Sequence, residues 1–222
     1  MEVKYFINEK NIKEEFGVYV SESSGIMDLP KIKEPTQQKW TEYHGTIVDL
    51  DAPRLEDREI TLDCFISAPN QFEFMRRLSA FYAEFIKPGF KRLRIEVGDC
   101  NRPLVFDTYI KDGIKVKKQW AEGSQQGKFQ IKLIEPNPQK KVLKFTATPE
   151  NMTASLTITT DLAVLITWGD NEKTDEVFTE EFEVGHAYAQ PGEYYISISG
   201  VISEIKNLTI DQTNTEIVWE IL

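Results

Sequence analysis

Residues 70–89 read NQFEFMRRLSAFYAEFIKPG, and this stretch decides the fold because it holds the one long helix that the sequence predicts. Asn70 can cap the first turn, since its side chain can accept a hydrogen bond from a free amide. Pro88 and Gly89 end the helix. Apolar side chains recur at helical spacing between them, namely Phe72, Phe74, Met75, Leu78, Phe81, Tyr82, Phe85 and Ile86. We expect helix 71–87 to bury this face against strands, which stabilises the fold by about 1.5–3 kcal/mol per fully buried large side chain.

Alternating strands surround this helix. The clearest is Arg58–Ile66, in which Cys64 shares one face with Ile60, Leu62 and Ile66. Cys64 is therefore expected to be a buried structural residue, and Cys64 and Cys100 are too few for a disulfide framework or a thiolate metal site. Further strands are predicted at 3–7, 11–20, 40–49, 92–97 and 104–110, with a short helical turn at 13–15 as the alternative within 11–20.

Turns and loops connect these strands. Residues 21–39 are rich in Ser, Pro, Lys and Gln, and they predict either an ordered arm that lies on a neighbour or a mobile loop. Asp112-Gly113 predicts a tight hairpin between 104–110 and 114–116. A second hairpin is expected between 115–121 and 128–134.

Residues 135–141 read EPNPQKK and separate two expected domains, 1–140 and 141–222. The two prolines remove ladder hydrogen bonds and stiffen the linker, so the domains should hold a fairly fixed relation. Seven short alternating segments follow in roughly eighty residues, a number typical of an immunoglobulin-like sandwich. The predicted fold is mainly β: an N-terminal β sandwich or barrel with one long helix, then an immunoglobulin-like β sandwich.

The charge is divided unevenly along the chain. The formal net charge is −10, from 26 basic and 36 acidic residues. Residues 142–222 carry three lysines against fourteen Asp and Glu, a local net of −11, which leaves +1 for the rest. Such an acidic half repels phosphate, so no specific nucleic acid binding is expected. No apolar run approaches the ~20 residues of a membrane span, and the N-terminus lacks a signal-peptide pattern, so neither membrane insertion nor export by that route is expected.

Residues that carry catalytic or metal chemistry are scarce. The only histidines, His44 and His186, fall in different expected domains. Asp170, Asn171 and Asp175 lack the ligand number and spacing of a calcium loop and are better explained as a solvated turn. The carboxylates at 49–57 have no evident cleft, and Arg54 and Arg58 among them suggest an ion-pair network within the subunit or across an interface. We therefore expect no enzyme, no cofactor and no metal.

The first expected domain resembles a known family. Phe16–Val20, Trp40–Gly45, Asp57–Leu62 and the helix followed by Pro88-Gly89 resemble the N-terminal domain of phage distal tail proteins, in the form carried by prophages of Bacteroides-like bacteria. The resemblance covers about residues 1–140. It implies a β sandwich or barrel with one helix, of which six copies close into a ring between the tail tube and the baseplate or fibre.

That resemblance also implies partners and a location. The ring-forming surfaces would include the 21–39 arm and the strands around Trp40 and Arg58, and the predicted interface residues are Trp40, Arg54 and Arg58. The partners would be further copies of this chain, tail tube proteins, and baseplate or fibre proteins. The protein would belong to the virion tail and be assembled in the bacterial cytoplasm.

The second expected domain resembles a polycystic-kidney-disease-type, immunoglobulin-like domain. Trp168-Gly169-Asp170 and the stretch from His186 to Tyr194, HAYAQPGEY, stand where that family has its Trp, its Gly-Asp turn and its His-x-Tyr…Pro-Gly-x-Tyr signature. The residues that usually separate the Trp from the Gly-Asp turn are missing, and Asn171 replaces the second glycine. Such domains bind proteins or sugars or act as spacers, so this resemblance identifies no ligand.

Together these observations lead to the hypothesis of a structural tail protein, whose helix-bearing domain forms a ring and whose acidic sandwich projects outward. The main alternative is a cell-surface carbohydrate-binding or adhesive protein, because paired β domains with exposed aromatic residues often have that role. An enzyme acting on glycans is a more distant alternative.

Overall fold

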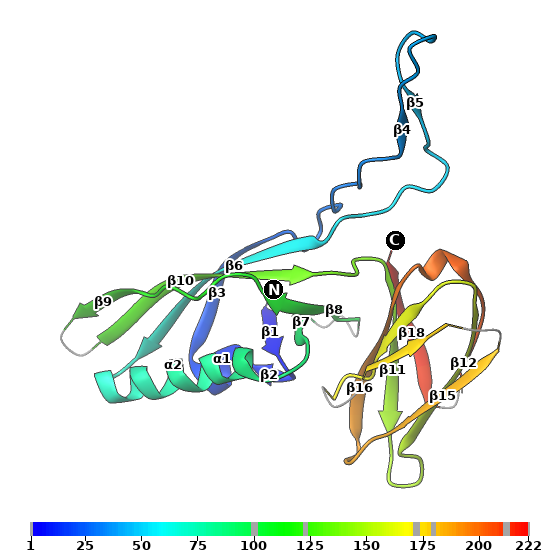
Figure 1. Cartoon of the computed structure of the whole chain (residues 1–222). Coiled ribbons are helices and arrows are strands. Elements are labelled where there is room, and N and C mark those ends of the chain that lie inside the picture. The colour runs from blue at the N-terminus through cyan, green and yellow to red at the C-terminus, as the bar shows by residue number, and fades with distance from the viewer. Residues whose placement is uncertain are drawn as a thin grey trace.

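The computed structural model describes residues 2–98, 102–121, 124–170, 174–178, 181–210 and 214–221 (Figure 1). The chain is mainly β, as the sequence predicts. Two residues discussed above, Cys100 and Asn171, lie outside the described residues. Cys64 is buried as expected, and burial raises the pKa of its thiol to about 12.

The N-terminal half forms one eight-stranded sheet, in the order β2-β1-β7-β8-β10-β6-β3, with β9 paired to β10. Its strands are β1 (Val3–Ile7), β2 (Lys10–Asn11), β3 (Val18–Ser24), β6 (Arg58–Ala68), β7 (Lys91–Val97), β8 (Leu104–Ile110), β9 (Lys117–Ala121) and β10 (Ser124–Glu135). The longest ladder joins β6 to β10, from Ala68 opposite Gln125 to Arg58 opposite Glu135. Among the described residues β2 and β3 are not paired to each other, so the sheet does not close into a barrel.

Helix α2 (Gln71–Ile86) covers one face of this sheet, as the sequence predicts (Figure 1). The side chain of Asn70 caps it by accepting a hydrogen bond from the amide of Glu73 at 2.9 Å. The core that it completes includes Ile60, Leu62, Ile66, Phe74, Leu78, Phe81 and Phe129.

The expectation that the whole apolar face of α2 is buried is wrong for three residues. Phe72, Met75 and Ile86 are 79%, 50% and 81% exposed. The physical reason is geometric, because the apolar arc of this helix is wider than the strip of a helix that one sheet can cover. The uncovered residues leave an apolar stripe on the outer side of α2.

The segment 11–20 adopts the predicted alternative, a helical turn. Helix α1 (Ile12–Phe16) lies between β2 and β3 and buries Ile12 and Phe16. The Asn11 side chain caps it, and Gly17, at φ +63°, ends it in the left-handed conformation that favours glycine.

Two other local predictions are corrected. Residues 40–49 are not a continuous strand, since only β4 (Gln37–Gln38) and β5 (Ile47–Val48) pair there. Residues 104–110 do not form a hairpin with 114–116, because β8 pairs with β7 and β10 instead. Ile114 and Val116 pack against the core, and this burial outweighs the local turn signal of Asp112-Gly113. The second predicted hairpin forms as β9 paired with β10, but β9 pairs with residues 124–128 rather than with 128–134.

The C-terminal half consists of a five-stranded sheet, β14-β13-β16-β11-β18, and a three-stranded sheet, β15-β12-β17. Side chains from both sheets share one core around Trp168, which is fully buried. All seven predicted segments contain strands, and β14 is an additional one. The elements are β11 (Lys140–Ala147), β12 (Thr153–Thr160), β13 (Val164–Thr167), β14 (Thr174–Val177), β15 (Phe182–Ala187), β16 (Gly192–Gly200), the 3-10 turn η1 (Ile202–Glu204), β17 (Ile205–Ile210) and β18 (Thr215–Ile221).

Candidate interaction surfaces

The arm, defined here as residues 25–57 between β3 and β6, projects away from the sheets of both halves of the chain (Figure 1). Only a few described contacts hold the arm in its conformation. Its two sides pair at β4 and β5, at the bridge between Ile32 and Leu55, and through hydrogen bonds such as that from the Lys33 amide to the Arg54 carbonyl at 2.7 Å. An isolated two-stranded ribbon is marginally stable in water, so a surface that covers the arm would stabilise it.

The arm exposes many large apolar side chains. They are Met27, Leu29, Ile32, Trp40, Tyr43, Ile47, Val48 and Leu50, with exposed fractions between 39% and 78%. Single exposed apolar residues are common on protein surfaces, but a contiguous group of them marks an interaction site. The arm is therefore the strongest candidate interaction surface among the described residues.

The base of the arm is tied firmly to the sheet by Arg58. Its Nη1 donates to the backbone carbonyls of Gly25, Ile26 and Asp28 at 3.3, 3.2 and 2.7 Å. Its Nε donates to Glu135 Oε2 at 3.0 Å. The arm thus leaves the body at a defined point, although its far end is held by few contacts.

The three predicted interface residues lie in different surroundings. Trp40 is 57% exposed in the far part of the arm, and Arg54 is half-buried beside Lys33. Arg58 is buried, and its carboxylate partner is Glu135 rather than one of the acids at 49–57 that the sequence suggested. No contact with another subunit tests whether these residues lie at an interface, so that assignment stays a prediction.

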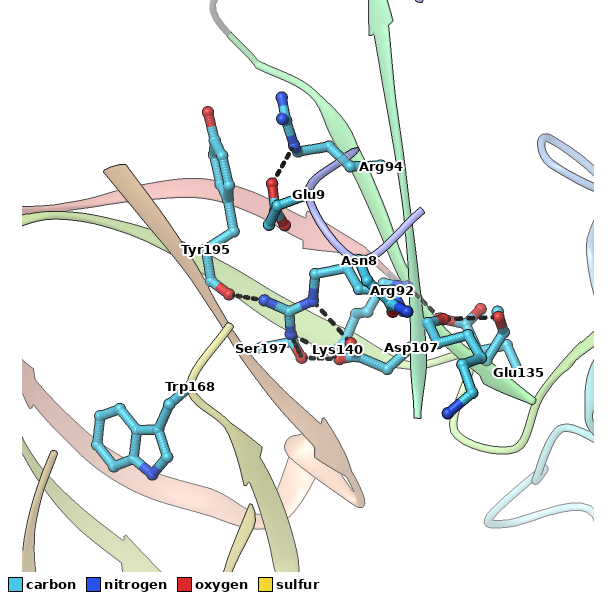
Figure 2. A network of polar contacts seen from close by, with 12 residues as sticks. Asn8, Glu9, Arg92, Arg94, Asp107, Glu135, Lys140, Trp168, Tyr195 and Ser197 are labelled. Atoms are coloured by element: carbon cyan, nitrogen blue, oxygen red, sulfur yellow. Dashed lines mark hydrogen bonds and ion pairs between the residues drawn. The ribbon is translucent and has the colours of Figure 1, made fainter. Parts of the chain in front are cut away.

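A second feature is a buried polar network between the two halves of the chain (Figure 2). Arg92 of β7 is fully buried, and it donates from Nε and Nη2 to the two oxygens of Asp107 at 2.8 and 3.1 Å. It also donates to the Tyr195 carbonyl and, at 3.3 Å, to Ser197 Oγ, both on β16. Arg92 therefore joins the N-terminal sheet directly to the five-stranded C-terminal sheet, to which β16 belongs.

The ionisation of Asp107 follows from this geometry. Burial opposes the charged form, but the adjacent Arg92 guanidinium and its hydrogen bonds outweigh burial and hold the pKa of Asp107 below its usual value. Next to this pair, Glu135 at the end of β10 accepts from Arg58 and from Lys140 at the start of β11. The network is a structural connection in which the charges are paired.

The network was not predicted from the sequence. Arg92 alternates with apolar residues in a strand that the sequence predicts to be half-buried, and Lys140 falls in the predicted linker. The sequence offers no prediction for the side chain of Asp107. Arg92 and Lys140 are buried because the two halves of the chain pack against each other here. The alternation of apolar and polar residues along a strand gives no information about such a long-range contact.

The motif residues that carry the second resemblance meet in one cluster. His186 stacks on Trp168 with ring centroids 5.3 Å apart, and its Nε2 lies against Asp170 Oδ2. Tyr188 donates its hydroxyl to the Trp168 carbonyl at 2.8 Å and stacks on Tyr194 at 3.8 Å. The cluster is packed inside the sandwich and so has a structural rather than a binding geometry.

No metal-binding arrangement is evident in the part of the chain that the structure describes. In these residues no group of three or more His, Cys, Asp or Glu side chains could hold an ion. Asp175 accepts from the indole of Trp168 at 2.8 Å, and Asp170 contacts His186. Within the described ranges no helix is long and apolar enough to cross a membrane.

Comparisons with known proteins give fold-level similarities only. No protein-family model and no curated protein matches the sequence. Among solved structures, the Dit protein of phage SPP1, described as a paradigm of the hub adsorption apparatus in phages that infect Gram-positive bacteria, is similar with a TM-score of 0.44 and 10% identity, over 97% of each chain. A chain of the activated baseplate of phage p2 is similar with a TM-score of 0.41 and 8% identity, over 100% of this chain and 96% of that one.

Proposed function

We propose that this chain is a structural component of a phage or prophage tail, which self-associates into a ring at the junction of the distal tail and the baseplate. The N-terminal sheet and the arm form the ring, and the acidic C-terminal sandwich, a polycystic-kidney-disease-like module, projects outward. The further partners are tail tube proteins and baseplate or fibre proteins. Six copies are expected from the resemblance to distal tail proteins, with assembly in the bacterial cytoplasm and no enzymatic activity.

The observation that carries this proposal is the arm. Its base is fixed by Arg58, whereas its far part exposes Trp40, Tyr43, Ile47 and Leu50 to water. Covering such side chains contributes about 25 cal/mol per Å² of apolar surface removed from water. A neighbouring copy with the same exposed surfaces is the simplest partner for a protein that forms a closed ring.

The experiment measures the mass of the full-length protein by native mass spectrometry and light scattering over a wide concentration range. Wild-type protein is expected to form a closed oligomer, and the double variant Trp40→Ser, Leu50→Ser is expected to be monomeric. The matched control is Phe72→Ser, Ile86→Ser on α2, because these side chains are at least as exposed as Trp40 and Leu50. This control should assemble like the wild type.

Two outcomes would contradict the proposal. The first is a wild-type protein that stays monomeric at high concentration and does not join tail tube or baseplate proteins. The second is equal loss of assembly in the arm variant and the helix control, which would show that exposed apolar surface in general, rather than the arm, drives association.

The carbohydrate-binding alternative is favoured by one feature, the exposure of Trp40 and Tyr43 near each other in sequence on the arm. Aromatic rings of this kind can stack on sugars. A glycan array distinguishes the two functions: a saturable signal that Trp40→Ala abolishes would support the alternative, and the absence of any signal would support the structural role.

A further inference from the structure

A lysine-lined groove lies on the face of the N-terminal sheet opposite to α2. Along β6 the even-numbered residues are buried toward the helix, so the odd-numbered ones lie on the other face. The groove encloses about 730 Å³ there, and its lining includes Ser21, Asp63, Lys115, Lys117, Lys128 and Gln130. We call it the lysine groove.

The charges of this groove are not balanced. Lys117 on β9 lies directly opposite Lys128 on β10, an arrangement that destabilises a strand pair through repulsion. The lining holds three lysines, Lys115, Lys117 and Lys128, against one carboxylate, that of Asp63, which accepts a hydrogen bond from Gln130 at 3.0 Å. A negatively charged partner would relieve the repulsion.

The same chain carries a complementary surface on its other half. Residues 142–222 have a net charge of −11. Glu181 and Glu183, just before and within β15, are exposed, and the Glu183 carboxylate accepts a hydrogen bond from the Ser155 hydroxyl at 3.1 Å. We call the exposed edge around these two carboxylates the acidic edge.

The two surfaces cannot meet within one molecule. The β9–β10 hairpin lies at one end of the elongated chain and β15 lies at the opposite end (Figure 1). Two different, complementary surfaces at opposite ends favour a head-to-tail contact between copies, and such contacts build rings when the rotation closes. Opposite charge also speeds and orients the encounter of the two surfaces.

We propose that the lysine groove of one copy receives the acidic edge of the next copy. This inference rests on the proposed ring and changes one part of it, because the edge of the sandwich at β15 contacts the next copy instead of projecting freely. The contact is separate from the arm and sets the direction of assembly. A polyanion such as DNA is the less favoured occupant, since residues 1–141 carry a net charge of only +1 and offer little long-range attraction for a continuous phosphate backbone.

The test is charge reversal in the full-length protein. Lys117→Glu, Lys128→Glu is expected to weaken self-association about tenfold or more, and wild-type association should weaken as salt rises, because the groove is exposed. Lys4→Glu, Lys13→Glu changes the net charge equally, outside the groove, and should leave association nearly unchanged. Circular dichroism checks that each variant is folded.

A rescue experiment makes the test specific. Glu181→Lys, Glu183→Lys alone should also associate weakly, whereas its mixture with Lys117→Glu, Lys128→Glu should form mixed assemblies. If the groove and control variants behave alike, or the mixture fails to assemble, the proposed contact is wrong even where the arm variant still abolishes the ring. A wild-type monomer would overturn the ring and this contact together. Groove-dependent binding of a 30-base-pair DNA duplex, measured by fluorescence anisotropy, would assign the groove to a polyanion instead.

Discussion

Two regions of the molecule depart from the usual placement of apolar residues in the core and charged residues at the surface. One is the junction between the N-terminal and C-terminal halves, the other is the arm, and they depart from it in opposite ways. At the junction, charged side chains are buried: Arg92 is 0% exposed and Lys140 is 2% exposed. On the arm, apolar side chains are exposed, with Trp40 at 57% and Leu50 at 71%. Each region departs from the expectation for its residue types.

The difference lies in where the partners are. Every charged group of the junction that Figure 2 labels finds its partner in the same chain, as in the Arg92–Asp107 and Lys140–Glu135 pairs. The apolar residues of the arm have few neighbours in the chain. The junction is therefore complete in the monomer, whereas the apolar side chains of the arm stay exposed to water there.

The largest expected effect comes from breaking the junction. Arg92→Ala leaves the carboxylate of Asp107 buried without its cation, and loss of one member of such a buried pair destabilises a protein by about 3–5 kcal/mol. Urea unfolding followed by circular dichroism measures this change in the free energy of unfolding.

The control for Arg92 is an exposed arginine pair. Arg76→Ala removes the pair with Glu73 on α2, where the Arg76 side chain is 61% exposed, and should lower the free energy of unfolding far less than Arg92→Ala does. Replacing both buried residues, in Arg92→Met, Asp107→Leu, should recover much of the lost stability, because no charge is then left unpaired. If Arg92→Ala and Arg76→Ala lower the free energy of unfolding equally, Arg92 is not held in a tightly packed, water-free junction.

A smaller effect is expected from two glycines that occupy the two ends of the arm. Gly25, at its base, has φ +81°, and an added Cβ would lie 1.9 Å from the Glu59 carbonyl oxygen. Gly45, near its tip, has φ +85°, and an added Cβ would meet nothing within 4 Å. Gly25→Ala should cost about 2–4 kcal/mol through strain and clash. Gly45→Ala should cost about 1 kcal/mol through the backbone conformation alone.

Thermal unfolding of the two glycine variants compares the fixed base of the arm with its free end. A similar loss in both would mean that the tip is packed against the body, which would contradict the description of the arm as a free surface.

The local elements were predictable from the sequence because their causes are local. Asn70, the spacing of Phe74, Leu78 and Phe81, and the stop at Pro88 define α2 within one stretch of chain. The alternation of 58–66 likewise predicts a strand with a buried Cys64. The hairpin predicted at 114–116 was wrong because Ile114 and Val116 pack against the core instead. The strand predicted at 40–49 was wrong because only Ile47 and Val48 find strand partners on the opposite side of the arm.

The candidate surfaces were only partly predictable. The composition of 21–39 indicated either an arm or a mobile loop, but the extent of the arm to residue 57 depends on pairings between residues far apart, such as Ile32 with Leu55. Arg58 was expected among acids at the surface, yet it is buried against Glu135, which lies 77 positions away in sequence. Long-range contacts of this kind leave no periodic signal in a single sequence.

The smallest expected effect completes the comparison. Trp40→Ser, Leu50→Ser should change the free energy of unfolding of the monomer by no more than about 0.5 kcal/mol, because exposed side chains lose little burial when they are replaced. The measurement is urea unfolding at a protein concentration low enough to keep the wild type monomeric. A loss of several kcal/mol would place these side chains in the packed structure of the monomer. In that case the failure of the same variant to assemble would follow from unfolding, and the arm would no longer be evidence for a partner.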